Sequence, residues 1–241
     1  RLGGVALVRQ KLGRDQPGNL LLAPVVLGLV FRAPPPPAIG RVVVVPPMKA
    51  HLEEKLLYAL FHHPELEDFW TAEIDSGSMA VLQETIPQTW VLDPRDVPPH
   101  AAITPPLRTA GKTIRRWNDL IGLSQTERKL VIKPSGFSEL AWGSRGVTIG
   151  HDANADEWRE DVESALGGFD RTPYILQQYH ASRRLNASYY DFESESLKDF
   201  DARARFSPYY FVRGDQAELA GLLVTACPSA SKLLHGMSDA V

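Results

Sequence analysis

The sequence predicts an α+β fold in which antiparallel strands are joined by hairpins and covered by amphipathic helices. Three signals support this class: a strand–loop–strand unit at 129–150, a long hairpin within 202–226, and a capped helix over about 154–166. In each hairpin, runs rich in β-branched or aromatic residues flank a turn that contains glycine. In the helix, apolar residues recur every four positions, which indicates one buried face.

The unit at 129–150 is the most informative stretch of the chain. Residues 130–132 are predicted as a buried strand, and Lys133 stands at its end, directly before Pro134, where the ladder is expected to stop. A loop rich in glycine and serine follows, and a second β-like run at 147–149 closes the unit. Glycines let backbone N–H groups approach phosphate oxygens, and a lysine supplies positive charge. The pattern favours a polyphosphate site, and a purely structural hairpin is the alternative.

This loop matches neither of the two best-known phosphate-binding motifs. The lysine precedes the glycines, so GxxxxGK[ST] is absent. GxGxxG is absent as well, and the loop leads into a strand, so no helix N-terminus would receive the phosphate.

The composition limits the classes of partner and compartment. The chain has 26 Lys+Arg against 29 Asp+Glu and a net charge of −3, so no nucleic-acid partner is expected. A single cysteine, Cys227, excludes an internal disulfide and suits a reducing, cytoplasmic compartment. The apolar stretch 19–31 is too short to span a bilayer and is interrupted by Pro24, so no membrane partner is expected. The chain begins at Arg1, and no secretory signal is evident.

The N-terminal quarter combines a linker-like stretch with one clear strand and one helix. Four prolines at 34–37 favour an extended linker, and docking to an aromatic groove of a partner is the alternative. Residues 41–45 are predicted as a buried strand, and a helix follows over about 48–63, ended by Pro64. Its leucines share one stripe: Leu52, Leu56 and Leu60.

In the middle of the chain we expect alternating strands, loops and helices. Residues 86–92 read as a turn that enters a strand, the proline-rich stretch 93–112 as a loop, and 113–122 as a short helix. The helix after the glycine-rich loop begins at a capping box, Asn154 with Glu157, carries Trp158, Val162 and Leu166 on one face, and ends at Gly167-Gly168. Residues 174–179 are predicted as the next strand.

In the last third, the acidic stretch 191–201 is expected to be a solvated loop, with a magnesium or amine-substrate site as the alternative. A long strand at 202–212 continues past Pro208, turns at 213–215 and pairs with 219–226. Cys227 is interpreted as a small buried hydrophobe, with a nucleophile as the alternative.

In their order and spacing, these pieces resemble the ATP-grasp superfamily, in particular the glutathione-synthetase-like ATP-binding domain. The resemblance covers about 48–212 and is carried by four motifs after a helix with an early lysine: IPQTWVL at 86–92, LVIKPSG at 130–136, GSRGV at 143–147 and ILQQY at 175–179. It implies two α/β subdomains, about 86–172 and 173–241, whose antiparallel sheets enclose a nucleotide cleft within a domain at 48–241. Residues 1–47 would then be the remnant of a preceding α/β domain.

The resemblance also implies roles for particular residues. Lys133, with Lys49 or Lys55, would contact the nucleotide phosphates. The stretch from Gly136 to Gly146 would be a mobile lid, with Gly143, Ser144 and Gly146 near the phosphates. Gln177, Gln178 and Tyr179 would form the hinge that reads the adenine. Arg203 and Arg205, which alternate onto one strand face, would stabilise the transferring phosphoryl group, and lining a solvated face is their alternative.

The function implied is that of an ATP-dependent ligase, which joins a small-molecule carboxylate to an amine or a thiol through an acylphosphate, with ATP and Mg²⁺ as cofactors. A homo-oligomer is left open. The chain departs from the pattern at the metal, because the last strand, 222–227, has no acidic residue. The remaining candidates are scattered: Asp191, Asp201, Glu218 and Asp239. A catalytically degenerate nucleotide-binding or scaffold protein of the same fold is therefore the alternative.

Overall fold

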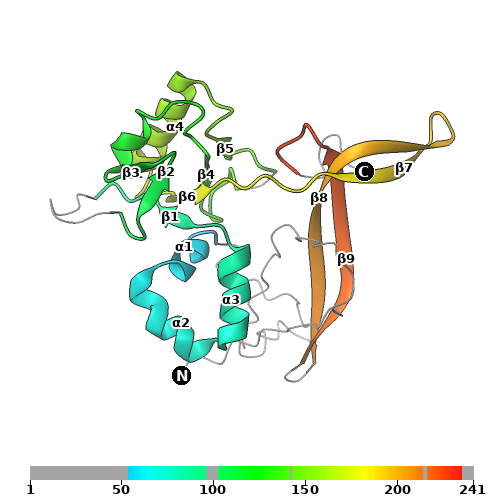
Figure 1. Cartoon of the computed structure of the whole chain (residues 1–241), viewed down its shortest axis with the longest axis horizontal. Coiled ribbons are helices and arrows are strands. Elements are labelled where there is room, and N and C mark those ends of the chain that lie inside the picture. The colour runs from blue at the N-terminus through cyan, green and yellow to red at the C-terminus, as the bar shows by residue number, and fades with distance from the viewer. Residues whose placement is uncertain (1–53, 96–102, 142, 214–215, 235–241) are drawn as a thin grey trace, which may run out of the picture. The chain divides into compact units, whose positions relative to one another are not determined.

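The computed structural model describes residues 54–95, 103–141, 143–213 and 216–234 (Figure 1). These residues form two compact units that meet in the sequence between His180 and Ala181. Helices and antiparallel sheets are both present, so the predicted α+β class is confirmed. None of the helices in these ranges is long and apolar enough to cross a membrane. The subdomain bounds implied by the resemblance remain a prediction.

Several predictions concern residues outside the described ranges. They are the proline run 34–37, the strand 41–45, the first part of the helix 48–63, and the candidate residues Lys49 and Asp239.

The unit that ends at His180 is built on a four-stranded antiparallel sheet in the order β1-β6-β4-β5. Its strands are β1 (Thr89–Val91), β4 (Leu130–Pro134), β5 (Thr148–Ile149) and β6 (Tyr174–Gln178). The strand–loop–strand prediction is confirmed, since β4 and β5 pair as a hairpin around the glycine-rich loop. Strand β4 extends one residue further than expected, because Pro134 still pairs with Tyr174.

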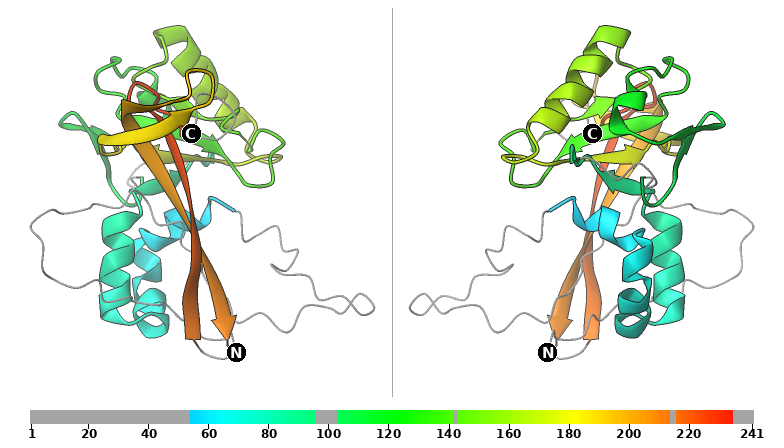
Figure 2. Two further views of the ribbon diagram at one scale, coloured as in Figure 1. Left: turned by 90° about the vertical axis from the view of Figure 1, so that its right-hand side faces the viewer. Right: turned by 90° about the vertical axis from the view of Figure 1, so that its left-hand side faces the viewer.

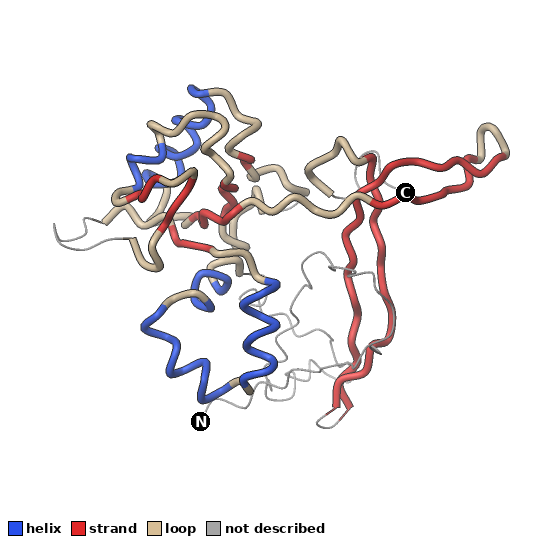
Figure 3. The backbone as a smooth tube through the Cα atoms, viewed as in Figure 1, coloured by secondary structure: helices blue, strands red, loops and turns tan. Residues whose placement is uncertain are grey.

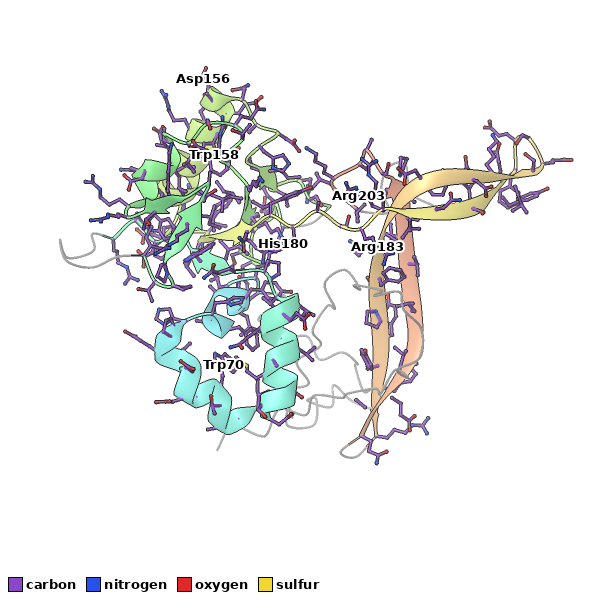
Figure 4. All side chains as sticks on the ribbon, viewed as in Figure 1. Trp70, Asp156, Trp158, His180, Arg183 and Arg203 are labelled. Atoms are coloured by element: carbon purple, nitrogen blue, oxygen red, sulfur yellow. The ribbon has the colours of Figure 1, made fainter. Side chains whose placement is uncertain are left out.

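Helix α4 (Ala155–Gly167) covers one face of this sheet, and its own Trp158 side chain lies in the core that they share (Figure 4). The predicted capping box is confirmed. The side chain of Asn154 accepts hydrogen bonds from the N–H groups of Asp156 and Glu157, at 2.9 and 3.0 Å, and the Glu157 carboxylate accepts one from the N–H of Asn154 at 2.9 Å. Trp158 and Val162 are fully buried, as expected. The predicted third member of the stripe, Leu166, is only partly buried.

Three short helices lie on the other side of the sheet: α1 (Leu57–Phe61), α2 (Glu67–Glu73) and α3 (Ser76–Thr85), with a 3-10 turn, η2 (Pro64–Leu66), between the first two (Figure 3). The predicted helix begins later than expected within its described part, and the leucine stripe is wrong at Leu60, which is 40% exposed. Phe61 is buried instead, because its ring stacks on Trp70 with centroids 4.4 Å apart.

The loop and helix predicted over 93–122 are corrected by a hairpin. Strands β2 (Leu107–Thr109) and β3 (Lys112–Ile114) pair across Ala110 and Gly111, whose φ angles are +48° and +79°. Two left-handed residues in a two-residue loop are typical of a hairpin turn. The helix predicted over 113–122 is wrong, and only a 3-10 turn, η3 (Trp117–Leu120), forms there. The helix prediction rests on Ile114, Trp117 and Ile121 lying on one side, but only Ile114 of these is buried. Leu120 of the 3-10 turn enters the core instead.

The unit that begins at Ala181 is a three-stranded antiparallel sheet: β7 (Leu185–Asp191), β8 (Ser196–Arg213) and β9 (Gln216–Pro228). The predicted hairpin is confirmed, and β8 runs through Pro208. The two strands coil around each other along their length (Figure 2). Cys227 is buried in β9, as expected.

The solvated loop predicted over 191–201 is wrong from Ser196 onward, where β8 begins and pairs with β7. Acidic residues are accommodated in these strands by partners across the ladder. Lys198 forms an ion pair with Asp191, and the hydroxyl of Ser188 donates to Asp199 at 2.5 Å. Cross-strand pairs of this kind stabilise a sheet that faces water.

Gly146 offers a test of how the glycine-rich loop is packed. A Cβ at this position would lie 2.8 Å from Cγ of Pro134 and 3.0 Å from Cβ of Leu140. We expect Gly146→Ala to lower the free energy of unfolding by about 1–3 kcal/mol, because both neighbours must shift.

In the control, Gly167→Ala, the new Cβ meets no heavy atom within 4 Å, and better helix propensity should raise the free energy of unfolding by up to about 1 kcal/mol. Urea denaturation measures both, and a Gly146→Ala protein as stable as the wild type would contradict the close packing.

Candidate functional site

The pairing of three strands collects polar side chains on the sheet face that points away from α4. Thr89 on β1 and Val131 on β4 both pair with Gln177 on β6. Lys133 lies two residues beyond Val131, so it shares the face of Gln177 and Thr89. The alternate residues point to the opposite face and enter the core beneath α4: Trp90, Leu130, Ile132 and Leu176.

A line of hydrogen bonds connects these polar groups. The Nζ of Lys133 donates to Oε1 of Gln177 at 2.6 Å, and Nε2 of Gln177 donates to Oγ1 of Thr89 at 2.9 Å. The Thr89 hydroxyl donates in turn to the carbonyl of Pro87 at 2.8 Å. Gln177 and Thr89 are buried, so both ends of the Gln177 amide are used inside the protein. A neutral amide oxygen orients the Lys133 ammonium without neutralising its charge.

The electrostatic environment of Lys133 is unfavourable to its charge. Burial, together with repulsion from Lys55, lowers the pKa of Lys133 from 10.5 to about 8. The two lysines predicted to contact phosphate, Lys55 and Lys133, are therefore close enough to repel each other, although 78 residues of sequence separate them. A strongly perturbed lysine of this kind is typical of a functional site.

The loop that follows Lys133 begins with two donors that face a carboxylate. The hydroxyl of Ser135, which is 1% exposed, donates to Oε2 of Glu54 at 2.5 Å, and the N–H of Gly136 donates to Oε1 at 3.4 Å. Glu54 also accepts from the N–H of Leu56 at 2.9 Å. Sequence reasoning missed both Glu54 and Ser135 as site residues. Ser135 stands inside a recognised motif, but no local pattern links it to a residue 81 positions earlier.

The other predicted lid residues shape the loop itself. Gly143 and Ser144 have φ angles of +61° and +60°, so the chain reverses through left-handed conformations there. The N–H of Gly146 donates to the carbonyl of Leu140 at 3.1 Å. That donor is therefore committed within the loop and does not point to a ligand in this conformation.

The predicted adenine hinge consists of the last two residues of β6, Gln177 and Gln178, and of Tyr179, which follows the strand. The N–H of Gln178 donates to the carbonyl of Gln88 at 2.9 Å, and that of Tyr179 to the carbonyl of Lys129 at 3.0 Å. The ring of Tyr179 packs edge-on against His151, with centroids 4.5 Å apart. The N–H groups of Gln178 and Tyr179 are therefore already bonded within the protein.

The predicted catalytic arginines lie on β8, in the other unit. Arg203 donates through Nε to the carbonyl of Ser229 at 2.8 Å and through a terminal nitrogen to the carbonyl of Ser182 at 2.5 Å (Figure 4). These bonds tie together the two chain segments that flank the three-stranded sheet. Arg205, two residues on, is exposed and pairs across the ladder with Thr225.

The described metal candidates do not fit a Mg²⁺ site. Asp191 forms an ion pair with Lys198 and accepts from the Ser194 hydroxyl at 2.6 Å, and these two hydrogen bonds lower its pKa to about 2. Asp201 accepts from the Ser229 hydroxyl at 2.6 Å and lies 3.5 Å from Arg184. Glu218 is exposed on β9. Over the described ranges, no group of three or more His, Cys, Asp or Glu side chains could hold a metal ion.

The kind of ligand that the site can bind is inferred from its geometry. Comparison with known proteins assigns no family, since no family model and no curated protein matches the chain. The geometry places Lys133 on the sheet near Lys55, which precedes α1, and the glycine-rich loop that follows Lys133 begins with a hydroxyl and an N–H that already hold a carboxylate. Such a site suits a ligand that carries several negative charges on a compact group.

The titration of Lys133 tests the arrangement directly. We expect the midpoint of Lys133, followed by NMR of its side chain, to lie near pH 8. Replacing Lys55 with alanine should move this midpoint upward, because removing a like charge favours the charged ammonium. Lys55→Arg keeps the charge and is the control that should leave the midpoint nearly unchanged. If the titration midpoint of Lys133 were unchanged in the Lys55→Ala protein, the two lysines would not interact.

Proposed function

We propose that the unit ending at His180 binds the polyphosphate of a nucleoside triphosphate, and that the chain is an ATP-grasp-like, ATP-dependent ligase. The observation that carries this proposal is the lowered pKa of Lys133 beside Lys55. The burial of the Lys133 ammonium and its repulsion by Lys55 both cost free energy, which a bound polyanion offsets. The order of strand lysine, glycine-rich loop and hinge strand in β4, the loop and β6 supports the same proposal.

The chemistry proposed is the transfer of the γ-phosphoryl group to a substrate carboxylate, followed by attack of an amine or a thiol on the acylphosphate. The task of the protein in such a transfer is positioning and charge neutralisation. Lys133, oriented by Gln177, and Lys55 would neutralise phosphate oxygens. The described carboxylates do not form a metal site, so no step is assigned to Mg²⁺.

A second candidate is a nucleotide-binding or scaffold protein of the same fold that does not catalyse ligation. The contacts of Arg203 favour it, because its guanidinium binds the carbonyls of Ser182 and Ser229. Those contacts give Arg203 a structural role within the three-stranded sheet. In this candidate the two lysines still bind the nucleotide.

Nucleotide binding is tested by thermal shift with a non-hydrolysable ATP analogue, with and without Mg²⁺. We expect the analogue to raise the melting temperature of the wild-type protein and to have much less effect on Lys133→Ala. Loss of one phosphate-contacting cation should weaken binding roughly tenfold to a hundredfold, since charge-assisted hydrogen bonds contribute about 1.5–3 kcal/mol. Lys129→Ala is the matched control, because Lys129 is an exposed lysine just before the same strand. No shift in the wild-type protein would refute the proposal.

Turnover separates the two candidates. A ligase should release ADP only when a carboxylic acid and an amine or thiol are both present. Binding of the analogue without ADP release across a panel of such pairs would select the non-catalytic candidate.

A further inference from the structure

The entrance of the glycine-rich loop already holds an anion, and that anion belongs to the chain itself. The carboxylate of Glu54 accepts hydrogen bonds from the Ser135 hydroxyl at 2.5 Å and from the N–H of Gly136 at 3.4 Å. Hydrogen bonds from a hydroxyl and a backbone N–H to an ionised oxygen are the contacts by which loops bind phosphates and carboxylates.

Both halves of this contact adjoin the two lysines. Glu54 directly precedes Lys55, and Ser135 follows Lys133 after a single proline. The Ser135 side chain is buried, so water has little access to its hydroxyl, and an acceptor must be supplied by the protein or by a ligand. The same small region thus combines two cations, two donors and one internal carboxylate.

We propose that Ser135 and Gly136 form an anion subsite for a phosphate group, and that Glu54 is an internal competitor which occupies this subsite until the ligand displaces it. The inference rests on the proposed function, since the ligand is taken to be a polyphosphate. The shared chemistry is that of a nucleoside triphosphate or of inorganic polyphosphate. An incoming phosphate would exchange one oxygen acceptor for another at Ser135 and Gly136, while Glu54 moves out to water.

The alternative is that Glu54 acts only as a structural tether of the loop. This alternative predicts the opposite change in ligand affinity when Glu54 is replaced. If Glu54 only holds the loop in place for binding, its removal disorders the donors and weakens affinity. If Glu54 competes, its removal frees the donors and also removes a negative charge that repels the ligand. The direction of the change therefore decides between the two roles.

The experiment is isothermal titration of the full chain with two probes, the non-hydrolysable ATP analogue and inorganic tripolyphosphate. We expect Glu54→Gln to bind both probes about tenfold more tightly than the wild-type protein, because a neutral amide competes less well for the same donors. Glu65→Gln is the control, since it removes the same charge from an exposed position in η2 and should leave both affinities nearly unchanged. Circular dichroism verifies that each variant is folded. If Glu54→Gln does not fold, Glu54→Asp, whose shorter side chain loosens the contact, should show a smaller tightening.

Unchanged or weaker affinity for both probes in Glu54→Gln would overturn the proposal, and so would a variant that binds neither probe. If tripolyphosphate binds more tightly to the variant but the ATP analogue binds to no form of the protein, the subsite stands and the nucleotide function fails. If the analogue binds equally well to the wild-type protein and to Glu54→Gln, the competitor role fails and the nucleotide function stands.

Discussion

The pairing of β4 with β6 is the constraint on which the candidate site depends. Its register, with Val131 opposite Gln177 and Lys133 opposite Ile175, decides which residues enter the core and which face away from it. A shift of β4 by one residue along β6 would send Lys133 beneath α4, away from Gln177, and bring Ile132 to the other face. The apolar core thereby fixes the polar site: the burial that holds Trp158 against the sheet also holds the lysine in place on the opposite side.

The site stores an electrostatic cost. Lys133 is buried, repelled by Lys55 and hydrogen-bonded only to a neutral amide in the sheet, so its charge is poorly compensated. A protein that only needed a stable sheet would gain by replacing Lys133 with an apolar residue. Sites that bind ligands often carry such a cost, because the same groups that are unfavourable in the free protein become favourable when an ion of opposite charge arrives.

Sequence reasoning was most successful where the signal was local. The Asn154–Glu157 capping box, the strand before Lys133 and the hairpin through Pro208 all depend on neighbouring residues, and all are present. It was unsuccessful where tertiary partners decide. The Ala110–Gly111 turn forms a hairpin where a loop was expected, and cross-strand partners such as Lys198 are found where an acidic loop was expected. The same holds for the candidate site. Lys133 could be predicted from the motif around it, whereas the Glu54–Ser135 contact joins residues from distant parts of the chain and could not.

The packing of Gly146 against Pro134 has a mechanical consequence. It fixes the far end of the glycine-rich loop to the end of β4, while Ser135 fixes the near end through Glu54. Both ends of the loop are therefore held by their neighbours, yet the loop still exposes two apolar side chains, Phe137 at 64% and Leu140 at 45%. A ligand that covered these side chains would remove apolar surface from water, so that its binding would gain hydrophobic free energy as well as charge neutralisation.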